Sequence, residues 1–153
     1  MSNEFKDLIG DFTAEQRENY ELCMKYPILI PHNDEEFYYE YTQLDFFPIG
    51  WKNAFGEQWA KEVQEAINKM PINFQKDAYI MDIKEKWGQL RIFLSVCSEE
   101  LEEVLQKYEK LSESVCMQCG KSKTRGFGGW FSYLCKDCEQ ELKNLRGWAD
   151  ADS

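Results

Sequence analysis

The chain has 153 residues, of which 43% are hydrophobic and 15% aromatic, so it has enough apolar material for one packed domain and is not mainly disordered. It carries 18 Lys and Arg against 28 Asp and Glu, a formal net charge of −10. A field of this sign repels nucleic acid and anionic membranes at long range. The single histidine, His32, makes histidine-based catalysis or metal binding improbable.

The N-terminal segment lacks the basic start and the apolar stretch of a secretory signal, and no apolar run approaches the ~20 residues that span a bilayer. These features predict a cytoplasmic protein with no membrane partner. In that reducing compartment, the six cysteines are expected to be thiols or metal ligands rather than disulfides.

Two helices are predicted in the first 70 residues. Thr13 followed by Gln16 matches a capping box, and Pro27 ends the pattern, so the first helix is expected over residues 13–26. The aromatic and acidic stretch that follows, up to Gly50, fits either a short helix or irregular structure. The second helix is indicated by an apolar stripe expected to be buried in the core, formed by Trp51, Phe55, Trp59, Val63, Ile67 and Met70.

Residues 79–96 change to a period of two, which predicts a β-hairpin with one buried face and a turn at residues 86–89. The residues expected on the buried face are Tyr79, Met81, Ile83, Leu90, Ile92, Leu94 and Val96. A third helix is predicted over residues 98–111, with Leu101, Val104, Leu105, Tyr108 and Leu111 directed inward. The fold class is therefore expected to be α+β, with helices packed on a small antiparallel hairpin.

Four cysteines near the C-terminus follow a C-x2-C-x15-C-x2-C pattern: Cys116, Cys119, Cys135 and Cys138. This spacing is typical of a four-thiolate zinc site. Glycines and aromatics within residues 126–133 predict a short hairpin between the pairs, and an apolar face predicts a helix from Cys138 that includes Leu142, Leu145 and Ala149. A knuckle, a hairpin and a helix make up a treble-clef or zinc-ribbon-like module.

One Zn2+ held by four thiolates has no open position for an activated water, so a structural rather than catalytic ion is expected. Basic residues lie beside the ligands: Lys121, Lys123, Arg125 and Lys136. They either contact nucleic acid or, more simply, stabilise the negative charge of the thiolate centre. The remaining cysteines, Cys23 and Cys97, are interpreted as small core residues.

The domain boundaries expected from these patterns are an α+β body over residues 1–115, a zinc module over residues 116–148 docked on it as one cooperative unit, and a tail over residues 149–153.

The outer face of the predicted hairpin carries Asp82, Lys84, Lys86 and Arg91, with Trp87 at the turn. A tryptophan among cations suits contact with an anionic partner or a nucleic-acid base. The alternative, a solvated face with Asp82–Arg91 pairing and Trp87 packed on the core, is the favoured interpretation. No phosphate-binding, hydrolase or metalloprotease motif is present.

The order of motifs resembles a group of small bacteriophage and prophage proteins that read K-E-K-F-G-G-L-R-F-Y before a C-x-x-C-G…G-G-W…C pattern. The matching elements here are Lys25-Tyr26-Pro27, Gly50-Trp51, the segment IKEKWGQLRIF from Ile83 to Phe93, Gly128-Gly129-Trp130 and the cysteine pairs. Trp87, Gln89 and Ile92 depart from the group's pattern. The resemblance covers about residues 25–140. It implies that hairpin and zinc module form one unit and that the protein acts on a bacterial host component.

Three classes of function follow. The first is a non-enzymatic, zinc-stabilised binding protein that engages or inhibits a host protein, for example a defence nuclease, and the acidic charge and lack of a catalytic motif favour it. The second is a zinc-finger nucleic-acid or nucleotide binder that uses Lys84, Lys86, Trp87 and Arg91. The third is an enzyme with a carboxylate site that the sequence does not identify.

Overall fold

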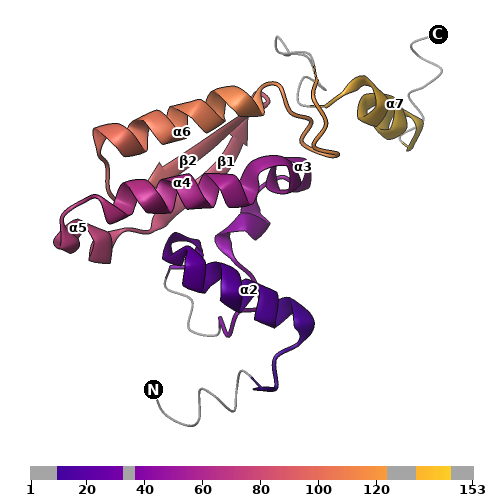
Figure 1. The fold of residues 1–153 in the computed structure, drawn as a ribbon. Coiled ribbons are helices and arrows are strands. Elements are labelled where there is room, and N and C mark those ends of the chain that lie inside the picture. The colour runs from indigo at the N-terminus through magenta and orange to yellow at the C-terminus, as the bar shows by residue number, and fades with distance from the viewer. Residues whose placement is uncertain (1–9, 33–36, 124–133, 146–153) are drawn as a thin grey trace.

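The computed structural model describes residues 10–32, 37–123 and 134–145 (Figure 1). In chain order the elements are α2 (Ala14–Lys25), η1 (Pro27–Leu29), η2 (Gln43–Phe46), α3 (Ile49–Trp51), η3 (Lys52–Gly56), α4 (Glu57–Asn68), α5 (Ile72–Asp77), β1 (Ile80–Lys86), β2 (Gln89–Leu94), α6 (Glu99–Ser112) and α7 (Lys136–Leu145). The α+β class predicted from the sequence is confirmed. No helix in the described ranges is long and apolar enough to cross a membrane.

The first helix, α2, begins where the capping box predicted. Gln16 N donates to Thr13 Oγ1 at 3.1 Å, and Thr13 N donates to Gln16 Oε1 at 2.8 Å, so two unpaired N–H groups at the helix start are satisfied. Pro27 prevents the helix from continuing and starts the short 3-10 turn η1. In the stretch that the sequence left open, the structure places a second 3-10 turn, η2, whose own capping box is formed by Thr42 and Asp45.

The elements α3, η3 and α4 form one continuous helix from residue 49 to residue 68, with a π-helical turn at its centre. Its buried stripe confirms the periodicity: the core includes Trp51, Phe55, Trp59, Val63 and Ile67, while Met70 lies half-buried beyond the helix end. α4 packs against α6, and α6 packs against β2, so two helices cover one face of the hairpin (Figure 1). This arrangement encloses the core.

The hairpin formed by β1 and β2 is antiparallel, with Lys84 opposite Arg91 and Ile83 opposite Ile92. The side chains predicted to face the core are correct for β2 but wrong at the start of β1. A β-bulge between residues 80 and 82 inserts Met81 as an extra residue, so Ile80 enters the core and Met81 is 61% exposed. The alternation of apolar and polar residues cannot reveal a bulge. One inserted residue moves every preceding side chain of the strand to the opposite face of the sheet.

Helix α6 confirms the third predicted helix, with one correction at its end. Leu101 and Tyr108 are buried as expected, but Leu111 is exposed and Ser112 is buried instead. The Ser112 hydroxyl accepts the backbone N–H of Leu90 at 2.9 Å and thereby satisfies one outward group of β2. The short helix α5 was not predicted, and it carries no buried residue that would give an apolar pattern.

A charged cluster joins α4 to α6. Lys107 Nζ lies 2.8 Å from Glu62 Oε1, and the buried Tyr108 hydroxyl donates to the other oxygen of Glu62. Burial raises the pKa of Glu62, but the hydrogen bonds from Lys107 and Tyr108 outweigh it and hold the pKa below the ordinary value of 4.5. A carboxyl group with a lowered folded-state pKa stabilises the fold above its ordinary pKa and loses this effect as the pH falls.

We therefore expect Glu62→Gln to lower the free energy of unfolding by about 1 kcal/mol at pH 7, a value discounted for the partial exposure of the pair. The difference from the native chain should shrink as the pH falls below about 4.5. Urea unfolding of both proteins at pH 7 and pH 3.5 measures it. An equal difference at the two pH values would contradict an electrostatic origin.

Candidate metal centre

The four cysteines predicted as ligands lie together in the structure. The Sγ atoms of Cys116, Cys119, Cys135 and Cys138 all lie within 4.8 Å of one another, and those of Cys119 and Cys135 are 3.7 Å apart. Zinc–sulfur bonds of ~2.3 Å in a tetrahedron place sulfurs ~3.8 Å apart. The observed separations therefore fit a metal ion held by four thiolates, and these residues form the candidate metal centre.

The first cysteine pair is held by a tight turn. Cys116 N donates to Lys121 O at 2.8 Å, and Gly120 N donates to Cys116 O at 3.0 Å. Gly120 has a φ of +79°, a conformation that side chains rarely adopt, so glycine is required here for both sulfurs to point to one side. A β-bridge between Val115 and Ser122 closes the base of the turn. We call residues 115–122 the first knuckle.

The first knuckle is fixed to the start of α3 by contacts that leave no room for a side chain. Gly50 N donates to Met117 O at 2.6 Å, and the indole Nε1 of Trp51 donates to Val115 O at 2.8 Å. A Cβ on Gly50 would lie 2.2 Å from Cys116 O, and a Cβ on Gly120 would lie 2.7 Å from Gly50 O. The body of the protein therefore positions the first two candidate ligands.

The second pair lies at the start of α7. Glu139 N donates to Cys135 O at 2.9 Å, so Cys135 immediately precedes the helix and Cys138 lies in its first turn. The positive end of the helix favours thiolate at this place. α7 has no buried residue, and Leu145, which was expected on an apolar face, is exposed. The hairpin predicted within residues 126–133, and Ala149, lie outside the described residues.

Hydrogen bonding favours a charged thiolate at the most buried ligand. Burial raises the pKa of the Cys116 thiol, but backbone N–H groups of Cys119, Cys135 and Gln118 outweigh it and bring the pKa to about 6. Burial and hydrogen bonding to the other cysteine sulfurs raise the pKa of Cys138. A bound cation would stabilise the thiolate form of every candidate ligand.

The other cysteines lie outside the centre. Cys23 is fully buried, and burial raises the pKa of its thiol to about 12, as suits a small core residue. The same interpretation is wrong for Cys97, which is exposed after the end of β2.

Of the basic residues beside the ligands, Lys123 donates from Nζ to Glu113 O at 2.6 Å, and Lys121 and Lys136 are exposed. Arg125 lies outside the described residues.

The second candidate site, on the outer face of the hairpin, is separate from the cysteines. Lys84, Lys86 and Arg91 are exposed as predicted. The predicted Asp82–Arg91 pair is not formed, because the bulge places Asp82 opposite Phe93, and its carboxylate instead lies 3.0 Å from Lys84 Nζ. Asp82 itself is half-buried.

Trp87 lies at the tip of this hairpin and is 77% exposed, so the prediction that it packs on the core is wrong. Trp87 and Gly88 have φ of +56° and +80°, the two-residue turn that matches the twist of antiparallel strands. Gly88 has no side chain, so the Trp87 ring is the one side chain that the centre of the turn presents, and it lies in solvent.

Sequence reasoning missed one group of residues that positions the candidate metal centre. Gly50 was noticed only as part of a motif and Trp51 only as part of that motif and of the buried stripe, because nothing in their local sequence indicates contact with residues 115–120. Comparison with protein-family models, with curated proteins and with solved structures finds no match.

Proposed function

We propose that the protein is a non-enzymatic binding protein, stabilised by one structural zinc ion, that engages a host protein in the bacterial cytoplasm. It would act as a phage or prophage factor, and inhibition of a defence nuclease is one form of this activity. The observation that carries the proposal is the conformation of Trp87, the large aromatic residue at the hairpin tip.

Trp87 is unfavourable for stability in two ways. Its φ of +56° is a left-handed conformation that costs a bulky residue about 1–2 kcal/mol relative to glycine, and its ring contributes no burial to the core. Asn-Gly is the favoured pair in such a turn. A residue that opposes stability yet presents a large aromatic surface suits an interface anchor, a role in which tryptophan is enriched.

The candidate metal centre supports this function because a bound ion would hold the C-terminal segment rigidly on the body of the protein. Four thiolates fill a tetrahedral ion, so the zinc would supply folding energy and no catalytic water. It would tie α7 to the first knuckle, which Gly50 and Trp51 fix to the body. We propose that residues 1–115 and 116–148 fold as one cooperative unit of body and treble-clef-like module.

Nucleic-acid binding is the second candidate, because the exposed Trp87 lies at the tip of the hairpin that also carries the exposed cations Lys84, Lys86 and Arg91. Stacking on an aromatic ring beside cations is how many proteins hold single strands. The net charge of −10 opposes this function at long range. A gel shift with single-stranded RNA or DNA that weakens steeply with salt would favour it over protein binding.

Replacing Trp87 tests the proposed function. We expect Trp87→Asn to raise the free energy of unfolding by about 1 kcal/mol, because asparagine tolerates the left-handed conformation. The same change should weaken binding to the host partner at least ~30-fold, the effect of losing about 2 kcal/mol at an interface anchor. Melting curves and quantitative affinity purification from host lysate measure the two effects.

The matched control is Phe74→Asn, which removes another exposed aromatic ring, on α5. It should leave the captured partner unchanged. A Trp87→Asn protein that is more stable and captures the same partner in the same amount would refute the role of Trp87.

A further inference from the structure

Strand β1 has an edge that no other described strand pairs with, since the sheet consists of β1 and β2 alone in that part of the chain. Lys86 and Gln89 flank a two-residue turn and therefore form a hydrogen-bonded pair. Because such pairs alternate, the backbone N–H and C=O groups of Ile83 and Glu85 point away from β2. No backbone hydrogen bond to another described segment engages them.

At the opposite edge of the sheet, one outward group of β2 has a partner within the described residues. The outward N–H of Leu90 donates to the buried hydroxyl of Ser112 at 2.9 Å. Helix α6 thus satisfies the outward N–H of Leu90 on β2, while in the described part of the chain the outward groups of Ile83 and Glu85 on β1 have no such partner. Unpaired backbone groups along a strand edge are a template for another strand.

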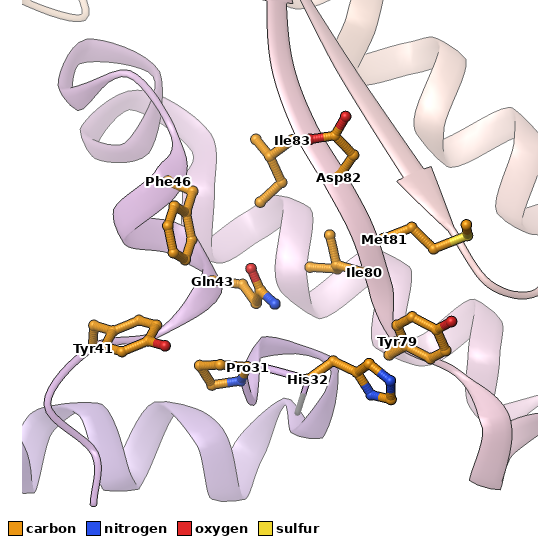
Figure 2. A pocket seen from close by; sticks show the side chains of 10 residues that line it. All are labelled: Pro31, His32, Tyr41, Gln43, Phe46, Tyr79, Ile80, Met81, Asp82 and Ile83. Atoms are coloured by element: carbon orange, nitrogen blue, oxygen red, sulfur yellow. The ribbon is translucent and has the colours of Figure 1, made fainter. Parts of the chain in front are cut away.

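A groove runs along the free edge of β1. One cavity of about 450 Å³ lies between β1 and the segment that includes Tyr41, Gln43 and Phe46. Figure 2 shows Ile80 and Ile83 pointing from β1 toward Phe46 and Gln43, while Met81 and Asp82 point away. A second cavity, of about 410 Å³, is lined by Phe46, Glu85 and Met117. Phe46 lines both cavities, so they adjoin along the strand.

The side chains beside this groove define the chemistry of an added strand. Its inner side chains would lie over Phe46 and Ile83, so they should be apolar. On the outer face β1 presents Lys86 and Lys84, the latter paired with Asp82 at 3.0 Å, and β2 adds Arg91, so the cations outnumber the one carboxylate. The carboxylate of Glu85 is occupied by Gly88 N at 2.7 Å. The outer side chains of the added strand should therefore be acidic.

We propose that the free edge of β1 binds an extended segment of the partner protein as a third strand, one in which apolar side chains alternate with acidic ones. Strand addition supplies affinity through main-chain hydrogen bonds and specificity through alternate side chains. The inference rests on the proposed function, because it identifies the kind of segment that the hairpin would engage.

The test uses the full, zinc-loaded chain labelled with 15N and a synthetic ten-residue peptide of alternating Val and Glu. We expect the peptide to shift the amide resonances of Ile83 and Glu85 and to slow their hydrogen exchange at least ~10-fold. The matched control is the peptide with Lys in place of Glu, which should bind at least ~10-fold more weakly because Lys84, Lys86 and Arg91 repel it.

Two variants of Ile83 distinguish the contribution of its backbone N–H to peptide binding from that of its side chain. Ile83→Pro removes the outward N–H without breaking a hydrogen bond to β2, since proline is tolerated at the free edge of a strand. It should weaken peptide binding at least ~10-fold relative to Ile83→Ala, which keeps the N–H. Phe46→Glu, at an exposed position, alters the groove wall without touching the hairpin and should also weaken binding at least ~10-fold.

Each remaining outcome overturns the proposal. A peptide that shifts only the Trp87 indole leaves the proposed function standing and refutes the added strand, as does a peptide that shifts nothing. Slow exchange of Ile83 and Glu85 that increases with protein concentration in the absence of peptide would assign the edge to a second copy of the chain. Failure of the proposed function is seen separately, in the Trp87→Asn purification.

Discussion

Replacing Trp59 with alanine is expected to lower the free energy of unfolding by about 3–5 kcal/mol, the range found for deletion of a fully buried aromatic ring. Trp59 is 0% exposed and packs edge-to-face on Phe47 with ring centroids 5.2 Å apart. Denaturant unfolding measures the loss. Trp87→Ala is the matched control and should change stability by less than about 1 kcal/mol, because that ring lies in solvent.

Phenylalanine variants of the two buried tryptophans add a finer comparison. Trp51 Nε1 donates to Val115 O, whereas Trp59 Nε1 has no hydrogen-bond partner among the described residues. Trp51→Phe should therefore cost about 1–3 kcal/mol more than Trp59→Phe, because only the former leaves a buried carbonyl unpaired. Equal losses would contradict the role of Trp51 in holding the first knuckle.

Gly50→Ala is expected to lower the free energy of unfolding by about 3 kcal/mol and to weaken metal binding. An added Cβ would lie 2.2 Å from Cys116 O and 2.5 Å from the carbonyl carbon of Met117, both backbone atoms that cannot rotate away. Helix propensity alone would favour alanine by about 1 kcal/mol. A loss of stability therefore reports the close contact between α3 and the first knuckle.

The matched control is Gly56→Ala in the same continuous helix. Its added Cβ would lie 3.3 Å from a methyl group of Leu44, and this side chain can adjust. Stability should change by less than about 1 kcal/mol in either direction. If Gly50→Ala were as well tolerated as Gly56→Ala in unfolding and zinc titrations, the contact would not fix the first knuckle.

The helices and the cysteine cluster could be predicted because their signals are local. Thr13 and Gln16 form a capping box within four residues, and the stripe from Trp51 to Ile67 repeats at the helical period. The cysteine spacing likewise defines a site without knowledge of the fold, and the four sulfurs are found together. The type of each element and the membership of the cysteine cluster are thus encoded over short distances in the chain.

The features that could not be predicted depend on contacts between distant segments. The bulge at Met81 reverses the faces of the strand start, and Ser112 is buried where Leu111 was expected because its hydroxyl satisfies Leu90. Gly50 meets the first knuckle more than sixty positions further along the chain. Trp87 lies in a turn, where alternation carries no information about burial.

The most direct test of the account is the metal content of the native, reduced protein. Elemental analysis is expected to find one zinc per chain in the native protein and in Cys97→Ser, which changes an exposed thiol outside the cluster. Cys119→Ser should contain almost none, and hydrogen exchange of residues 136–145 should accelerate, because metal-binding energy is folding energy in such modules. Native protein without zinc, or Cys119→Ser with a full equivalent, would contradict the four-cysteine zinc site.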